Sequence, residues 1–184
     1  MKLGLVLLAS GFARRFGGNK LLYPVEGRSL VERAMDACPP ELFRRAVAVS
    51  QYDEVLDLAA GRGYLPVPNL HPERGQSESV KLGLSFLSDC DGVLFAVCDQ
   101  PWLTRESVER LLAAFRDRPE AIAALSWRGQ RGNPVLFPRD LFPALAALEG
   151  DAGGGPVLRD HPERLVLVEA SSPRELEDLD APPQ

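Results

Sequence analysis

The chain has 184 residues, of which 45% are hydrophobic, 26% charged and 7% aromatic, a composition typical of a soluble globular protein with one domain over residues 1–184. The formal net charge of -5 argues against nucleic acid as the main partner, because binding to a phosphate backbone requires a basic surface. No apolar stretch approaches the roughly 20 residues that span a bilayer, and no signal-peptide pattern precedes the first apolar run, so we expect no membrane partner and a cytoplasmic protein.

The first motif is an apolar run at residues 3–8 that leads directly into a loop rich in glycine and cations. The run is short enough for one buried strand, and residues 8–20 read LASGFARRFGGNK. Glycines let backbone amides approach a ligand, and cations at the carboxyl end of a strand suit a polyphosphate. The loop fits neither the P-loop pattern nor the dinucleotide pattern GxGxxG. The alternative is a surface loop that is merely rich in glycine and arginine. The residues concerned are Gly11, Gly17, Gly18, Arg14, Arg15 and Lys20.

Strand and helix patterns alternate along the rest of the chain, and such alternation predicts an α/β fold, a three-layer α/β/α sandwich with a mostly parallel sheet. We expect further strands at residues 46–50, 64–67, 93–98, 121–127 and 165–168, and within residues 131–137 a Gly-Asn-Pro turn that leads into a strand. We expect helices at residues 30–38, 53–60 and 139–149, one capped by Ser77, one capped by Thr104 and a short one within residues 150–158. The cysteines form no CxxC pair, so we expect Cys38, Cys90 and Cys98 to be small core side chains rather than a zinc site or disulfides.

A Gly-Gln-Ser turn at residues 75–77 precedes one of these helices. A turn of this kind at a helix N-terminus offers backbone amides, an amide side chain and hydroxyls, which can bind a phosphate or the edge of a base. The alternative is an ordinary helix start, with Ser77 as its N-cap.

Asp99 is the first charged residue after the apolar run at residues 93–98. The carboxyl end of a central parallel strand places it at the same sheet edge as the opening loop. A carboxylate there suits Mg²⁺, a hard cation that takes one or two carboxylates plus phosphate oxygens. The alternative is a turn-forming aspartate before Pro101.

Further carboxylates follow near the end of the chain. Asp151 stands before three glycines, where it is either a helix cap or a substrate contact. Asp178 and Asp180 are two residues apart, and therefore lie on one side of an extended segment. Taken alone, an acidic tail is typical of a solvated terminus.

The loop at residues 8–22 resembles the signature loop of the nucleotidyltransferases, with Leu-Ala-small-Gly, then Arg and Gly, then Lys-Leu-Leu. Within that superfamily it is most similar to the molybdenum cofactor cytidylyltransferase and guanylyltransferase group. Similar motifs extend the resemblance over nearly the whole chain, at residues 75–80, 99–101, 132–135, 150–153 and 178–181. In the last of these, Ala181 stands where the family usually has Thr.

The resemblance implies a Rossmann-like nucleotidyltransferase fold and a set of site residues. Arg15, Lys20 and Asp99 are expected to be catalytic. The nucleotide is expected to contact Leu8, Ala9, Ser10, Gly11, Arg15, Lys20, Gly75, Gln76, Ser77 and Ser79. Asp99 is expected to hold Mg²⁺, with Asp178 or Asp180 as second ligands. The acceptor is expected to contact Gln100, Asn133 and Asp151.

The activity that follows is transfer of a nucleoside monophosphate from an NTP to the phosphate of molybdopterin, with release of pyrophosphate. Two anions must meet, and like charges about 4 Å apart repel by about 4 kcal/mol at an effective dielectric constant near 20, so cations and a metal must offset the repulsion. The alternatives are a sugar phosphate or another cofactor phosphate as acceptor, and a non-catalytic protein that carries the cofactor to a molybdenum hydroxylase. Lys20 and Asp99 together favour catalysis, because a carrier needs no metal carboxylate.

Ser10 bears on the choice of base. At this position the guanylyl branch has Gly and the cytidylyl branch has Ala, so Ser10 matches neither. Any Cβ there narrows the space beside the backbone and favours the smaller pyrimidine. The Asp-Gln-Pro motif at residues 99–101 also resembles the cytidylyl branch more closely. We therefore predict CTP over GTP.

Overall fold

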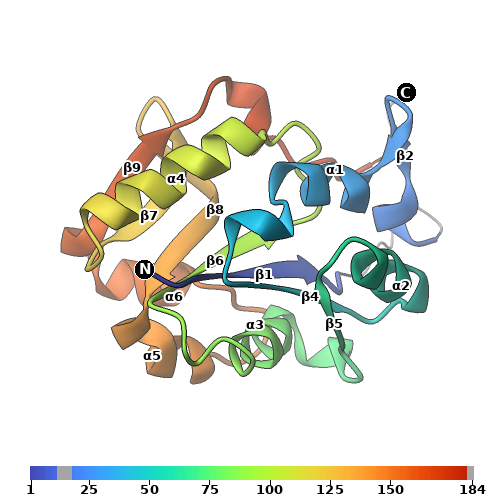
Figure 1. The fold of residues 1–184 in the computed structure, drawn as a ribbon, viewed down its shortest axis with the longest axis horizontal. Coiled ribbons are helices and arrows are strands. Elements are labelled where there is room, and N and C mark those ends of the chain that lie inside the picture. Colours follow the sequence, from blue (N-terminus) through green and yellow to red (C-terminus); the bar gives the residue numbers. More distant parts are fainter. Residues whose placement is uncertain (12–17, 182–184) are drawn as a thin grey trace.

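The computed structural model of the protein describes residues 1–11 and 18–181, and its central element is a seven-stranded sheet (Figure 1). From one edge to the other, the strands are β5 (Leu65–Pro68), β4 (Arg45–Ser50), β1 (Leu3–Ala9), β6 (Gly92–Val97), β8 (Gln130–Pro138), β7 (Ile122–Trp127) and β9 (Leu165–Glu169). Neighbouring strands are parallel, except that β8 runs antiparallel to both β6 and β7. A separate hairpin joins β2 (Pro24–Val25) to β3 (Arg28–Ser29). The carboxyl ends of β4, β1 and β6 therefore meet at one edge of the sheet.

Helices cover both faces of the sheet. One face carries α1 (Leu30–Ala37), α2 (Asp53–Gly61) and α4 (Arg105–Asp117), and the other carries α3 (Gln76–Leu84), α5 (Phe142–Ala146) and α6 (Gly155–Asp160). Figure 1 shows α1 and α4 on one side of the sheet and α3 and α5 on the other. The predicted three-layer α/β/α sandwich with a mostly parallel sheet is confirmed.

The core consists of two clusters, because successive side chains of a strand point to opposite faces of the sheet. In β1, Leu5 and Leu7 pack in the cluster beneath α1 and α4, whereas Val6 packs in the cluster beneath α3. All of them are fully buried, which explains why the run is apolar at every position. The three cysteines are free thiols buried in the same clusters, as predicted.

Two of the predicted helix starts are confirmed. At α1, the Ser29 hydroxyl accepts a hydrogen bond from the Glu32 amide at 3.4 Å, and the Glu32 carboxylate accepts one from the Ser29 amide at 2.9 Å. At α4, the Thr104 hydroxyl accepts from the Ser107 amide at 3.2 Å. In each case a side chain satisfies an amide that the first helical turn leaves without a partner.

Two other local predictions are wrong. Ser77 is not the N-cap of α3; it lies inside the helix and is buried, while Gly75 takes the N-cap position at φ 86°. The helix expected at residues 139–149 is interrupted: a 3-10 turn (Arg139–Leu141) precedes α5, which ends at Ala146. Pro143 lies in the first turn of α5, where a missing amide hydrogen costs nothing, and it favours a new helix start there.

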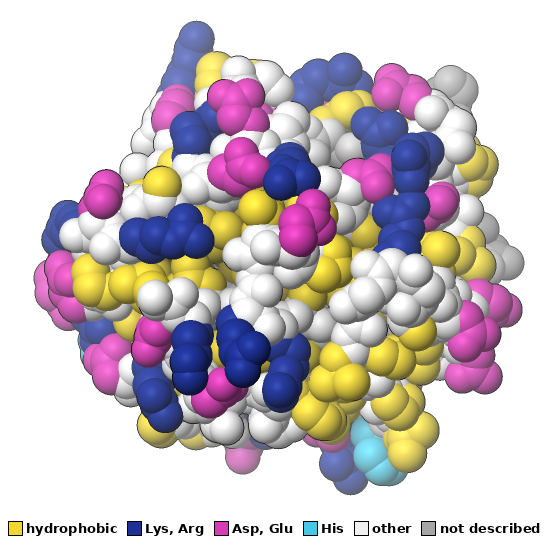
Figure 2. All heavy atoms as spheres, viewed as in Figure 1, with side chains coloured by type: hydrophobic (Ala, Val, Ile, Leu, Met, Phe, Trp, Pro, Cys, Tyr) yellow, Lys and Arg dark blue, Asp and Glu magenta, His cyan; other side chains and the backbone are white. Residues whose placement is uncertain are grey.

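The surface mixes both signs of charge. Figure 2 shows Lys and Arg side chains interspersed with Asp and Glu on the face of the molecule that it presents. On α4, for example, Arg105 pairs with Glu109 at 2.8 Å and Arg110 with Glu106 at 2.9 Å. Within residues 1–11 and 18–181, no helix has both the length and the apolar character needed to cross a membrane.

Candidate active site

A cleft of about 740 Å³ opens at the sheet edge where the carboxyl ends of β1 and β6 meet. This edge is where ligands bind in open parallel sheets. Its walls come from the end of β1, the turn at Lys20, the residues leading into α3, the end of β6 and the loop after α5. Among the predicted site residues, it is lined by Leu8, Ser10, Gly11, Lys20, Gly75, Gln76, Ser79, Asp99 and Asp151. Segments far apart in sequence thus converge on one cavity.

One wall of the cleft is built from charged side chains. The ammonium of Lys20 lies 3.4 Å from Oδ2 of Asp99 and 3.6 Å from Oδ1 of Asp180. Burial raises the pKa of Asp99, the ammonium of Lys20 opposes that rise, and the nearby charge of Asp178 adds to it, so the net pKa is raised. An extra cation beside Asp99 would therefore relieve an unfavourable buried charge. Lys20 and Asp99 line the cleft, and Asp178 and Asp180 lie beside them; we call these four residues the charged wall.

The acidic tail lies against this wall. The Leu179 amide donates to the carbonyl oxygen of Asp99 at 2.8 Å, and Nε2 of Gln100 donates to Oδ1 of Asp178 at 3.0 Å. The carboxylates of Asp178 and Asp180 therefore flank the end of β6, although both residues are exposed to solvent. The acidic tail is thus anchored at the sheet edge by hydrogen bonds, while its two carboxylates remain open to solvent.

The charged wall fits a hard divalent cation in its chemistry. Its acidic members offer only carboxylate oxygens, which Mg²⁺ prefers, and Mg²⁺ takes one or two carboxylates from the protein and its other ligands from water and phosphate. In the described part of the chain, no group of three or more His, Cys, Asp or Glu side chains is arranged to hold a metal alone. Asp99 with one further carboxylate is therefore the donor set that the protein can supply.

The opposite wall is built mainly from backbone. Gly75, at φ 86°, packs so tightly that a Cβ there would come within 2.5 Å of the Gly150 carbonyl group. The Ser77 amide donates to the Gly150 carbonyl oxygen at 3.2 Å, and the Gln76 amide donates to Oδ1 of Asp151 at 3.2 Å. Asp151 therefore contacts the first residue of α3 and does not cap α6, the short helix that follows it, whose N-cap Gly154 has no side-chain hydrogen bond. We call Gly75, Gln76, Gly150 and Asp151 the backbone wall.

Ser10 and Gly11, which also line the cleft, are held by residues that the sequence patterns did not single out. The Ser10 hydroxyl donates to the Val49 carbonyl oxygen at 3.3 Å, and the Ser10 carbonyl oxygen accepts from Nε2 of Gln51 at 2.6 Å. The Tyr52 hydroxyl donates to the carbonyl oxygen of Gly11 at 3.1 Å. Gln51 and Tyr52, which follow β4, thus hold the start of the opening loop through side-chain hydrogen bonds to its backbone. No sequence motif predicted these contacts.

Asn69 is a further contact that the patterns missed. It is buried at the edge of the cleft, donates to the Ser79 hydroxyl at 3.1 Å and accepts from the His71 amide at 2.9 Å. The Asn followed two residues later by His-Pro is a turn signal that could have drawn attention to it. Its partner Ser79, a predicted nucleotide contact, is held in place by this bond.

The remaining predicted residues lie elsewhere. Ala9 and Ser77 are buried and do not line the cleft. Gln100 is 4% exposed, and its side chain is bound to the tail instead of facing the cavity. Asn133 lines a second cavity of about 200 Å³, which shares Leu8 and Gln76 with the first. Arg15 lies outside the described residues.

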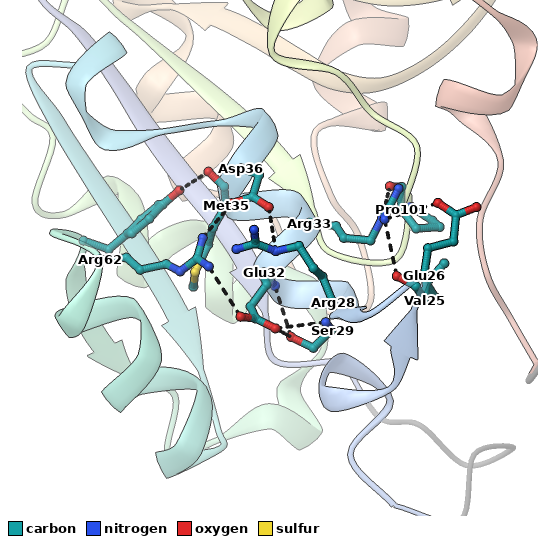
Figure 3. Close-up of polar contacts among 11 residues, drawn as sticks. Val25, Glu26, Arg28, Ser29, Glu32, Arg33, Met35, Asp36, Arg62 and Pro101 are labelled. Carbon is teal, nitrogen blue, oxygen red and sulfur yellow. Dashed lines mark hydrogen bonds and ion pairs between the residues drawn. The ribbon is translucent and has the colours of Figure 1, made fainter.

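A basic side chain on α1 connects the loop after Asp99 with the hairpin. Nε of Arg33 donates to the Pro101 carbonyl oxygen at 2.7 Å, and its NH1 donates to the Val25 carbonyl oxygen at 3.3 Å (Figure 3). On the neighbouring surface of α1, Arg62 reaches Asp36 at 2.8 Å. The contacts of Arg33 brace the loop that carries the Asp-Gln-Pro motif.

Comparison with known proteins agrees with this geometry. Residues 5–165 match the family model of the MobA-like NTP transferase domain. The purine catabolism protein PucB of Bacillus subtilis (strain 168) is 29% identical over 96% of this chain and 91% of its own length. The nicotine blue oxidoreductase of Paenarthrobacter nicotinovorans is 33% identical over 95% of this chain and 90% of its own. A molybdenum cofactor guanylyltransferase of Mesorhizobium japonicum is 30% identical over 76% of this chain and 69% of its own.

Solved structures share the fold. A nucleotidyl transferase from Methanothermobacter thermautotroptrophicus superposes with a TM-score of 0.82 at 24% identity, over 98% of this chain and 92% of that one. Rv0371c from Mycobacterium tuberculosis gives a TM-score of 0.78 at 21% identity, over 98% and 93%. The family match spans most of the chain and includes Lys20, Asp99 and the whole backbone wall, but not Asp178 and Asp180. The chain therefore belongs to the MobA-like NTP transferase family.

Proposed function

We propose that the protein transfers a nucleoside monophosphate, preferably CMP, from an NTP to the phosphate of a molybdopterin-type acceptor. The observation that carries the proposal is the pairing of Lys20 with Asp99 in the cleft at the carboxyl edge of the sheet, with Asp180 in contact with Lys20. A cation and carboxylates at that edge match what a triphosphate with a divalent metal requires. Relatives named molybdenum cofactor guanylyltransferase support the acceptor class.

In the proposed reaction, an oxygen of the acceptor phosphate attacks the α-phosphorus of the NTP. The bond between the α-phosphorus and the oxygen bridging to the β-phosphate breaks, and pyrophosphate leaves with that oxygen. We assign Lys20 to the triphosphate, where its charge offsets the repulsion between donor and acceptor. Arg15 is assigned to the same role from its motif position alone.

We assign Mg²⁺ to Asp99 together with Asp178 or Asp180. When bound, the ion neutralises charge on the phosphates and favours an in-line arrangement of donor and acceptor. Asp99 is held for this role through its backbone, because its carbonyl oxygen accepts the Leu179 amide and Arg33 braces the loop at Pro101.

We assign the nucleotide base to the space between Ser10 and the backbone wall, and the acceptor to the second cavity with Asn133. These two cavities share Leu8 and Gln76, so a nucleotide in the first and an acceptor in the second would be neighbours. We do not assign Gln100 to the acceptor, because its buried side chain is engaged with Asp178.

Incubation of the protein with Mg²⁺, CTP and molybdopterin tests the reaction. We expect pyrophosphate and a CMP-linked acceptor in equal amounts. A carrier of the finished cofactor would bind the adduct and release no pyrophosphate, and a preference for sugar phosphates in an acceptor panel would move the protein to the alternative enzyme class.

The preference for CTP has its own test, a competition between equal CTP and GTP. We expect Ser10→Gly to shift incorporation toward GTP, because loss of the Cβ widens the cleft. Ser10→Ala is the matched control: it keeps the Cβ and loses only a hydroxyl that is bonded to the Val49 carbonyl oxygen, so it should retain the parent's preference. A parent protein that favours GTP contradicts the assignment.

A further inference from the structure

The C-terminal segment, residues 171–180, is held against the active site by contacts that begin well before its acidic residues. It lies beyond residues 5–165, which match the family model. The segment starts beside α4, passes over Gly132 and ends beside Asp99. At Gly132, an added Cβ would come within 2.7 Å of a methyl group of Leu176, so the segment packs on the sheet without space to spare.

Glu175 is the anchor of this segment. It is only 1% exposed, and its Oε2 accepts hydrogen bonds from the Thr104 amide at 3.1 Å and the Thr104 hydroxyl at 2.9 Å. Its Oε1 accepts from the Ser171 amide at 2.7 Å. Burial raises the pKa of Glu175, but the hydrogen bonds from Ser107, Thr104 and Ser171 outweigh that effect, and the net pKa is lowered. The buried side chain is therefore a carboxylate near the positive end of the α4 dipole.

Only a side chain with two acceptor oxygens satisfies this arrangement. A glutamine would offer one oxygen, and its NH₂ group would face either the Thr104 donors or the Ser171 amide. A buried donor that loses its acceptor costs stability, so the segment would move away from such a clash.

Hydrogen bonds and an ion pair connect the segment that Glu175 anchors to the charged wall. Nε2 of Gln100 donates to the Leu176 carbonyl oxygen at 3.4 Å and to Asp178 at 3.0 Å. The Leu179 amide then binds the carbonyl oxygen of Asp99, and Asp180 reaches Lys20. Few residues separate the anchor from the acidic side chains, so a shift at Glu175 displaces them directly.

We propose that Glu175 is a positioning residue, whose buried carboxylate fixes the C-terminal segment so that Asp178 and Asp180 stand beside Asp99 in the active site. The role in catalysis rests on the proposed function. Glu175 does not touch the substrates; it acts through the two aspartates. Its loss therefore weakens the use of Mg²⁺ more than the binding of the nucleotide base.

The experiment compares Glu175→Gln with Glu177→Gln, an exposed residue of the same segment with the same change of charge. In the full-length protein without metal, hydrogen exchange at the Leu179 amide should be about tenfold faster in Glu175→Gln, with exchange in β1 unchanged. The Mg²⁺ concentration for half-maximal transfer should rise about tenfold, while the KM for CTP stays within twofold. Glu177→Gln should match the parent in all three measurements.

A purely structural role would lower the melting temperature but leave the Mg²⁺ requirement unchanged, and that result overturns the proposal. So does exchange at Leu179 that is equal in the two variants. If Glu175→Gln loses the protection of β1 and does not fold, Glu175→Asp, which keeps the charge, replaces it with the same expected directions.

The link through the aspartates is tested by combining Glu175→Gln with Asp180→Asn. If Glu175 acts through the segment, its effect on the Mg²⁺ requirement shrinks in that background, whereas independent effects add. A parent protein that transfers no nucleotide contradicts the proposed function, and the exchange measurement then decides alone whether Glu175 fixes the segment.

Discussion

The two walls of the cleft are held together by different forces. In the charged wall, Lys20 and Asp99 meet through side-chain charges in a site that is partly open to water. In the backbone wall, Gly75 packs directly on the backbone of Gly150, with no room for a Cβ. In the charged wall, a charged side chain can be replaced by a neutral one of similar size without a steric clash. In the backbone wall, any side chain at Gly75 would clash with Gly150. Substitutions in the charged wall should therefore change activity first, and those in the backbone wall should change stability first.

Asp99→Asn should have the largest effect of any single change in the charged wall. Asparagine keeps the size of the side chain and removes the charge assigned to Mg²⁺. A metal ion contributes several kcal/mol to transition-state stabilisation, so we expect kcat to fall about 10³-fold, measured as pyrophosphate release at saturating CTP.

The same variant should keep its fold. Because the folded-state pKa of Asp99 is raised, its ionised form costs stability at pH values above the folded and unfolded pKa, and this cost disappears in the neutral variant. We expect the melting temperature without metal to be no lower than that of the parent. Full activity at ordinary Mg²⁺ concentration would remove Asp99 from the metal site.

Gly75→Ala tests the backbone wall. The positive φ and the contact with Gly150 both oppose a side chain, so we expect a loss of about 3 kcal/mol of unfolding free energy, measured by urea denaturation. Gly61→Ala is the matched control, since Gly61 ends α2 with nothing within 4 Å of an added Cβ. It should stabilise by up to about 1 kcal/mol. Equal stability of the two variants would show that the backbone wall is not rigid.

Lys20→Ala should lower kcat/KM about 10²-fold, the size of effect typical for removal of one group that stabilises charge in a transition state. Lys2→Ala is the control, because Lys2 is an exposed lysine at the amino end of β1, away from the cleft. Comparable losses in both variants would point to a general effect of net charge instead of a contact with the triphosphate.

Substitutions at Asp151, the acidic side chain of the backbone wall, should give the smallest effect. Asp151→Ala removes the acceptor for the Gln76 amide and should cost about 1 kcal/mol of stability, as for a lost N-cap. Asp151→Asn keeps an acceptor oxygen and should retain the parent's stability and activity. An inactive Asp151→Asn of normal stability would instead make Asp151 a substrate contact.

Sequence patterns predict a helix or strand well where residues close together in the sequence determine that element. The apolar run of β1 and the capping box at Ser29 each predict their element from neighbouring residues. Lys20 and Asp99 are also placed correctly in the cleft, because the carboxyl ends of adjacent parallel strands must share one edge.

Long-range contacts explain what the patterns miss. Ser77 matches the N-cap pattern in sequence, but the fit between Gly75 and Gly150 starts the helix earlier, and residues 75 and 150 are distant in sequence. Likewise, the acidic tail has the composition of a solvated terminus, and contacts of Glu175, Asp178, Leu179 and Asp180 with distant residues hold it at the site. Contacts of this kind, between residues far apart in the sequence, produce no periodic pattern in the sequence.

A single-turnover experiment tests whether the charged wall supports nucleotidyl transfer. Enzyme in excess over CTP is mixed with Mg²⁺ and molybdopterin, and pyrophosphate and CMP-linked acceptor are quantified at successive times. We expect both products to appear together in the parent protein, one of each per CTP consumed, and at least about 10³-fold more slowly in Asp99→Asn. Binding of CTP and acceptor without pyrophosphate, or equal rates in the two proteins, would contradict this expectation.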